Sequence, residues 1–252
     1  MIELKNVSKS YDGVRNAVDD LTLDIRDGEI FVFLGPNGAG KTTTLKLIAG
    51  LLSLDQGSIA VNGYDIEQSP LEAKRRFAFV PDNPDTFQRM KGIEYLRFIG
   101  DIYGVGSKDR EQRVLDLTHR FGIQDVMNQM IRTYSHGMKQ KLILTGALLH
   151  DPETWILDEP MTGLDPASSF QLKQLMREHA DAGKTVLFST HVLEVAEKVC
   201  DRLSVIDNGR LLFVGTMGEL KKRFAEDASL ESLFLRLVYE SGQGEKPEGH
   251  GR

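Results

Sequence analysis

One segment of this sequence has the residue types and spacing needed to hold phosphate groups. Gly35-Pro36-Asn37-Gly38-Ala39-Gly40-Lys41-Thr42 matches the spacing of a phosphate-binding loop, and it follows the apolar run 30–34 and precedes a helical pattern. Glycines let backbone N–H groups face the phosphates, and the following helix presents its positive end. Lys41 would reach the β and γ phosphates, and Thr42 would offer an oxygen to Mg²⁺. We predict an ATP site formed by 35–42 and the adjoining Thr43; the alternative is a glycine turn beside a surface lysine.

Two adjacent carboxylates follow another apolar run. Thr154-Trp155-Ile156-Leu157 leads into Asp158 and Glu159, and an open parallel sheet binds its ligand at this end of its strands. Asp158 would hold Mg²⁺ directly or through water, and Glu159 would polarise the attacking water. Side chains of neighbouring strand residues point to opposite faces, but a bend at the strand end brings both to one site. The alternative is that Asp158 and Glu159 are only solvated residues at a strand end, and the presence of a phosphate-binding loop makes this alternative improbable.

Continuous apolar runs indicate the strands that must position these groups. The runs 30–34, 154–157, 185–188 and 203–206 are typical of parallel strands buried on both faces, and the helical patterns 43–49 and 168–182 lie between strands. Alternating apolar residues near 2–4, 21–25 and 58–61 predict an antiparallel layer, and Asn208-Gly209 predicts a hairpin. Residues 92–149 show helical spacing. The expected fold is an α/β P-loop core with an antiparallel β subdomain and an inserted helical subdomain at about 84–150.

Length and composition set further limits. The 252 residues suit one domain, which we place at 1–235, followed by a solvated tail at 236–252. The net charge of −6 gives no general attraction to nucleic acid, so no nucleic-acid partner is expected. No apolar stretch approaches the ~18 residues needed to cross a bilayer, and no targeting peptide is visible. Cys200 is the only cysteine, which excludes an internal disulfide and agrees with a cytosolic location.

Three further motifs resemble those of the ABC ATPase family. Tyr134-Ser135-His136-Gly137-Met138-Lys139-Gln140-Lys141 resembles the family signature, Leu-Ser-Gly-Gly-Gln, with Ser135 and Gly137 as its serine and second glycine. Gly163-Leu164-Asp165-Pro166 resembles the D-loop, whose aspartate crosses a dimer interface in the family. Ser189-Thr190-His191 resembles the switch histidine that touches the γ-phosphate, and Tyr11 matches the aromatic that stacks on adenine. The alternative for Tyr11 is that it packs the β layer; Tyr134, His136 and Met138 depart from the signature.

The resemblance covers roughly residues 1–235 and implies an enzyme that hydrolyses ATP to ADP and phosphate with Mg²⁺. The family's Q-loop glutamine is replaced by Asp82, which offers a shorter, charged oxygen to Mg²⁺ or to the lytic water. We interpret Asp82 as the γ-phosphate sensor. This substitution and the signature variant are most similar to bacterial ABC-2 type exporter ATPases.

That resemblance implies particular partners and a place in the cell. The partners would be a separate transmembrane permease subunit and a second ATPase subunit, identical or a close paralogue, at the cytoplasmic face of the membrane. Segment 84–90 is our candidate contact with the permease. The rival interpretations are an ABC ATPase acting on ribosomes or DNA, and a P-loop kinase or GTPase, which leaves the last three motifs unexplained.

Overall fold

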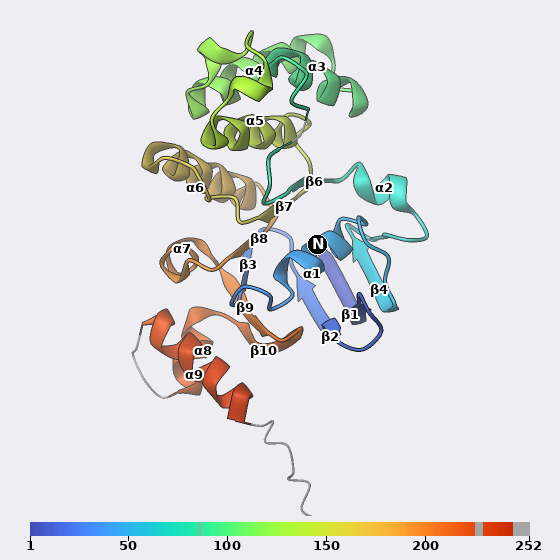
Figure 1. Ribbon diagram of the computed structural model, residues 1–252, viewed down its shortest axis with the longest axis vertical. Coiled ribbons are helices and arrows are strands. Elements are labelled where there is room, and N and C mark those ends of the chain that lie inside the picture. Colours follow the sequence, from blue (N-terminus) through green and yellow to red (C-terminus); the bar gives the residue numbers. More distant parts are fainter. Residues whose placement is uncertain (86, 225–228, 244–252) are drawn as a thin grey trace, which may run out of the picture.

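The computed structural model describes residues 1–85, 87–224 and 229–243 and contains two β-sheets (Figure 1). The smaller sheet has four strands in the order β2-β1-β4-β5, and its neighbouring strands are antiparallel. Its strands are β1 (Ile2–Ser10), β2 (Asn16–Ile25), β4 (Gln56–Val61) and β5 (Tyr64–Asp65). Leu4 lies opposite Leu23 on one neighbour and Ile59 on the other, so the alternating apolar residues face one core. The predicted antiparallel layer is confirmed.

The larger sheet carries the predicted parallel strands. Its order is β10-β9-β3-β8-β7-β6, and β10 alone pairs antiparallel, with β9. The strands are β3 (Ile30–Leu34), β6 (Phe77–Val80), β7 (Thr154–Asp158), β8 (Thr185–Thr190), β9 (Arg202–Asp207) and β10 (Arg210–Gly215). Asn208 and Gly209 have φ of 47° and 79°, as a tight hairpin turn requires, which confirms the predicted hairpin.

Burial of β3 on both faces explains its continuous apolar sequence. Phe31 and Phe33 pack in the cluster that contains the core residues of β1, β2 and β4. Val32 and Leu34 belong to the other cluster, which the helices cover. Successive residues of a strand point to opposite faces, so both faces of this strand must be apolar. The phosphate-binding loop therefore leaves a strand that has no solvent-exposed side.

Helices surround the larger sheet and extend beyond one of its ends. Figure 1 shows α3, α4 and α5 grouped at one end of the molecule, beyond β6 and β7, where we predicted a helical subdomain near 84–150. The helices are α1 (Lys41–Ile48), α2 (Pro70–Lys74), α3 (Gly92–Ile102), α4 (Ser107–Phe121), η1 (Gln124–Val126), η2 (Ile131–Thr133), α5 (His136–Leu148), α6 (Pro166–Asp181), α7 (Leu193–Val199), α8 (Met217–Arg223) and α9 (Leu230–Gln243). None of those in the described part of the chain is both long and apolar enough to cross a bilayer.

The C-terminal boundary differs from the sequence-based expectation. Helix α9 continues to Gln243, so the tail that we expected from 236 does not begin there. Leu230, Leu233 and Leu237 are buried in the core, which accounts for the helix. Their spacing of three and four residues places them on one face. The remainder of the expected tail, 244–252, lies outside the described residues.

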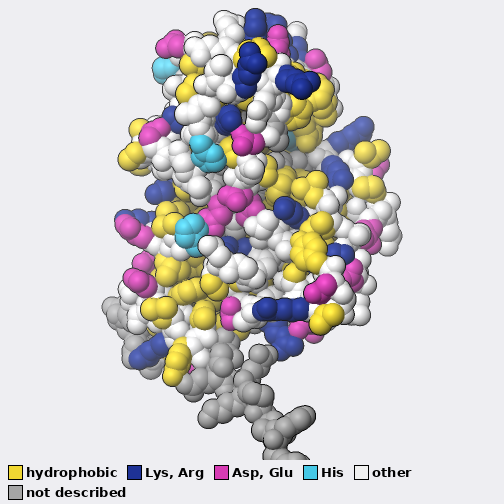
Figure 2. Space-filling model, in the orientation of Figure 1, with side chains coloured by type: hydrophobic (Ala, Val, Ile, Leu, Met, Phe, Trp, Pro, Cys, Tyr) yellow, Lys and Arg dark blue, Asp and Glu magenta, His cyan; other side chains and the backbone are white. Residues whose placement is uncertain are grey.

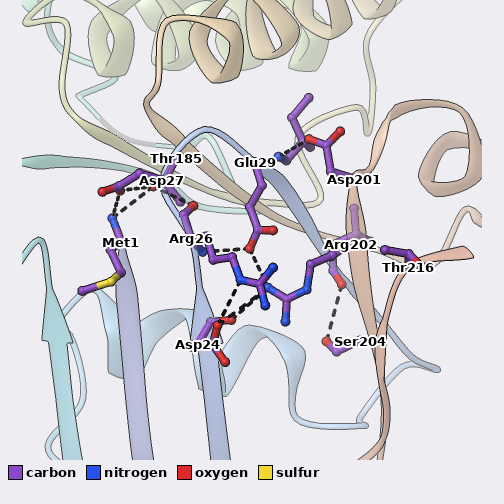
Figure 3. Close-up of polar contacts among 12 residues, drawn as sticks. Met1, Asp24, Arg26, Asp27, Glu29, Thr185, Asp201, Arg202, Ser204 and Thr216 are labelled. Carbon is purple, nitrogen blue, oxygen red and sulfur yellow. Dashed lines mark hydrogen bonds and ion pairs between the residues drawn. The ribbon is translucent and has the colours of Figure 1, made fainter. Parts of the chain in front are cut away.

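A buried ion pair joins the turn before β3 to the start of β9 (Figure 3). Arg202 Nη1 lies 2.9 Å from Glu29 Oε1, and the two side chains are only 12% and 9% exposed. Glu29 also accepts a hydrogen bond from Arg26 N at 2.8 Å. Removing one partner of a buried pair leaves the other charge uncompensated. We expect Arg202→Met to lower the free energy of unfolding by about 3 kcal/mol in urea titrations.

Two companion variants show whether the loss comes from the unpaired charge. Glu29→Gln together with Arg202→Met keeps the acceptor for Arg26 N but removes both charges, so it should recover most of the lost stability. Lys198→Met breaks the exposed Lys198–Glu194 pair and should cost less than about 1 kcal/mol. Equal losses for Arg202→Met and Lys198→Met would contradict the assignment.

Candidate nucleotide site

The phosphate-binding loop joins β3 to α1 and is held by close backbone approaches. Gly40 has φ of 106° and precedes α1; a Cβ atom there would lie 2.4 Å from Ala17 O. Only glycine fits both conditions. Gly209 N donates to Ala39 O at 2.9 Å, so the β9–β10 turn supports the loop from the side. The sequence motif did not reveal this support, although Asn208-Gly209 indicated a turn.

Lys41 lies folded into its own loop. Its side chain is buried, and Nζ donates to Gly35 O at 2.7 Å and to Pro36 O at 3.0 Å. Burial lowers the pKa of Lys41, and the negative charges of Glu159 and Asp158 act in the opposite direction. An ammonium group held beside the loop backbone is placed to meet a phosphate oxygen.

The two adjacent carboxylates occupy different environments at the end of β7. Asp158 is 1% exposed and accepts a hydrogen bond from Ser189 Oγ at 2.6 Å, while its Oδ2 has no hydrogen-bond partner among the described residues. Glu159 has φ of 46°, in the left-handed region, and its N–H donates to Ser189 Oγ at 3.0 Å. This conformation is uncommon outside glycine and supplies the bend at the strand end that we expected.

Glu159 is also in contact with the predicted switch histidine. His191 Nδ1 lies 3.0 Å from Glu159 Oε1, and the two residues follow neighbouring strands, β7 and β8. The glutamate side chain is 14% exposed and the histidine 54%. Sequence reasoning placed both residues at the site but missed Ser189, which links Asp158 to the Glu159 backbone. The signal available was its position two residues before His191.

A cavity of about 310 Å³ brings most of the predicted residues together. Its lining residues are Tyr11, Ala17, Asn37, Gly38, Gly40, Lys41, Thr42, Thr43, Asp82 and Glu159. Asp82, just after β6, thus shares the cavity with the phosphate-binding loop. Figure 2 shows acidic side chains gathered near mid-height on the visible face, with histidines above and below them.

Tyr11 stands at the rim of the cavity. It is 66% exposed, and its hydroxyl lies 3.2 Å from Thr43 Oγ1. Its ring is therefore not buried in the β layer. An exposed ring beside a phosphate-binding loop is free to receive a flat nucleobase.

The residues predicted from the signature and the D-loop do not line this cavity. Ser135 caps α5 and accepts a hydrogen bond from Met138 N at 3.3 Å. A Cβ at Gly137 would lie 2.6 Å from Gly163 O, so the signature packs on the D-loop. Asp165 caps α6 through Ser168 N at 2.9 Å and pairs with Lys141 at 2.6 Å. The hydrogen bond from Lys141, followed by those from Ser168, lowers the pKa of Asp165. Within one chain, the signature and the phosphate-binding cavity are separate.

Comparison with known proteins agrees with this geometry. The family model described as "ABC transporter" matches residues 18–162, more than half of the chain. The chain belongs to the ABC transporter family. This ABC ATPase is 38% identical over 242 residues to the daunorubicin/doxorubicin resistance ATP-binding protein DrrA of Streptomyces peucetius, covering 96% of the chain and 71% of that protein. It is 37% identical over 220 residues to the Nod factor export ATP-binding protein I of Cupriavidus metallidurans, covering 87% and 72%.

A solved structure resembles the ABC ATPase over nearly its whole length. It is described as the ATP binding subunit of an ABC transporter, with a TM-score of 0.90 and 34% identity, covering 94% of this chain and 99% of that one. The predicted fold and family are confirmed. The chain is an ATP-binding ATPase of the ABC class, and the rival P-loop kinase or GTPase is excluded.

Proposed function

We propose that this ABC ATPase powers export across the cytoplasmic membrane through a separate transmembrane subunit, as a peripheral protein at the cytoplasmic face. Two ATPase subunits would hold two ATP molecules, each between one subunit's phosphate-binding loop and the other's Ser135 and Gly137. The observation that supports the dimer is that the signature does not line the nucleotide cavity of its own chain. The Cupriavidus relative is named as an export ATP-binding protein, which supports export as the direction of transport.

The described residues fit a nucleotide with Mg²⁺. Asp158 has a buried carboxylate oxygen without a hydrogen-bond partner, and Thr42 lines the cavity with Asp82. Mg²⁺ prefers oxygen ligands and is usually held by one or two carboxylates together with substrate phosphates. Thr42, Asp158 and Asp82 would hold it in this ABC ATPase. When bound, the ion neutralises charge on the β and γ phosphates.

Different residues of the chain would bind the nucleotide, activate the water and stabilise the developing charge. The Tyr11 ring would stack on adenine, and residues 35–43 would bind the phosphates through backbone N–H groups and Lys41. Glu159 would orient and polarise the attacking water, helped by its contact with His191. Lys41 and His191 would stabilise the charge that develops on the γ-phosphoryl group. Asp82 would sense the loss of that group.

The loop that begins at Asp82 also offers a surface for a membrane partner. Phe87 is 43% exposed, and its ring centroid lies 5.7 Å from that of Phe98, which is 41% exposed. Exposed aromatic pairs are common at protein interfaces, since their burial contributes much of the binding free energy. We propose this pair as part of the contact with the transmembrane subunit, near the predicted segment 84–90.

Affinity purification from gently solubilised membranes tests the partner. We expect one polytopic membrane protein in stoichiometric amount with the parental chain, and at least tenfold less with Phe87→Asp, because burying an unpaired charge costs several kcal/mol. Leu71→Asp, in α2 and 67% exposed, is the matched control and should retain the partner. Recovery of ribosomes without any membrane protein would instead favour the rival soluble function. Full recovery by Phe87→Asp would exclude this surface.

A further inference from the structure

Three consecutive residues of α5 bond to two loops, the one after β6 and the one between β7 and α6. Lys139 Nζ lies 2.6 Å from Asp85 Oδ1, Gln140 Nε2 lies 3.4 Å from Pro160 O, and Lys141 Nζ lies 2.6 Å from Asp165 Oδ2. Side chains of successive helix residues diverge by about 100° around the axis, so one turn can reach in three directions. The start of α5 is thereby attached to two segments of the chain, and to the second of them at two points.

Each of these segments carries a residue of the proposed mechanism. Asp85 lies three residues after Asp82, which lines the nucleotide cavity. Pro160 directly follows Glu159, and Asp165 caps the helix after the D-loop. At the other side of the connection, Ser135 caps α5 itself. The contacts of α5 with these loops and the Ser135 cap at its start therefore lie on one hydrogen-bonded helix.

The Lys139–Asp85 pair is the connection most dependent on charge. The lysine side chain is 15% exposed and that of Asp85 is 49% exposed, so the pair is partly shielded from water. The Lys139 ammonium lowers the pKa of Asp85. Among the described residues, this ion pair joins α5 to the 82–91 loop, whereas Gln140 and Lys141 reach the segment after β7.

We infer that Lys139 is a positioning residue that links the Asp82 loop to the signature Ser135. Through this link, the nucleotide cavity of a chain is coupled to the signature that the same chain presents to the nucleotide of the other subunit. This inference rests on the proposed dimer. According to this inference, the Lys139–Asp85 pair is necessary for ATP turnover but not for binding of nucleotide to the phosphate-binding loop of the same chain. None of Asp85, Lys139 and Ser135 lines the cavity that would hold that nucleotide.

A charge-exchange experiment on the purified full chain tests the inference. Lys139→Glu places two carboxylates together, Asp85→Lys two ammonium groups, and the double variant restores a pair of opposite charges. The matched control is Lys184→Glu, which breaks the Lys184–Asp151 pair, also 2.6 Å apart, just before the starts of β7 and β8. Three quantities are measured for each variant: the Kd of a fluorescent ATP analogue, the kcat of ATP hydrolysis, and the Tm.

We expect each single exchange to lower kcat about tenfold with Kd unchanged within twofold, since a small misplacement of a catalytic half-site is costly. The double variant should return kcat to within about twofold of the parental value, and Lys184→Glu should leave kcat unchanged at a comparable Tm. A loss of kcat in Lys184→Glu equal to that in Lys139→Glu would overturn the inference. So would a double variant as slow as the single ones.

Ser135→Ala separates failure of this inference from failure of the dimer. If Ser135→Ala lowers kcat but Lys139→Glu does not, the dimer stands and the positioning role of Lys139 is wrong. If Ser135→Ala leaves kcat unchanged, the signature does not complete a second site, and both proposals fall.

Discussion

Glu159→Gln is expected to slow ATP turnover by ~10² to 10⁴ while leaving ATP binding intact. The substitution keeps the shape and the hydrogen-bonding capacity of the side chain but removes the charge that would polarise water. Glu159 lines the nucleotide cavity and lies 3.0 Å from His191, so the change acts at the site itself. Single-turnover hydrolysis and equilibrium binding of labelled ATP, measured on the same preparation, check both halves of this expectation.

A matched variant shows that the effect belongs to this carboxylate. Glu153→Gln changes a glutamate at the opposite end of β7, where Glu153 pairs with Arg76 at 2.5 Å, and should leave turnover within about twofold. Hydrolysis by Glu159→Gln at the parental rate would remove Glu159 from the role of base. A parallel loss of ATP binding would point to a damaged site instead.

Asp158→Asn is expected to abolish most of the dependence on Mg²⁺. Oδ2 of Asp158 is buried and has no hydrogen-bond partner in the part of the chain that the structure describes, and the other oxygen accepts a hydrogen bond from Ser189. The amide can still meet Ser189 but is a weaker ligand for a hard cation. We expect turnover to fall by at least ~10², because metal stabilisation of phosphoryl charge contributes several kcal/mol. Calorimetric titration of ATP with Mg²⁺ and with EDTA should give two nearly equal affinities for the variant.

The parental chain supplies the comparison for this experiment. Its ATP affinity should rise when Mg²⁺ replaces EDTA, and its hydrolysis should cease in EDTA. An Asp158→Asn chain that retains the full Mg²⁺ effect on affinity would show that the ion is held elsewhere, with Asp82 the next residue to test.

The sequence predicted the core of this fold because its signals are local. The run 30–34 is buried on both faces, and the glycines of 35–40 have few uses other than a tight loop around phosphate. The α9 boundary was missed because α9 packs against α7, β9 and β10, and no local pattern encodes these contacts. The helical spacing of the apolar residues in α9 does not by itself distinguish a packed helix from a solvated one.

Other features of the site depend on packing that no local pattern encodes. The pairing of Lys141 with Asp165 requires α5 to lie against the start of α6, and the bond from Ser189 to Asp158 requires β7 and β8 to be neighbours. The left-handed φ of Glu159 could not be predicted either, because glutamate as a residue type does not favour this conformation. The sequence thus identified the chemical groups, while the structure shows how they are held.

Mixing two inactive variants tests most directly whether one chain supplies half of each site. Lys41→Met removes the phosphate-binding lysine and keeps the signature, whereas Ser135→Glu places a negative charge in the signature and keeps the cavity. Each alone should be nearly inactive. In an equimolar mixture about half of the dimers would contain one intact composite site, which predicts roughly one quarter of the parental activity. A mixture no more active than the mean of its two components would contradict the composite site.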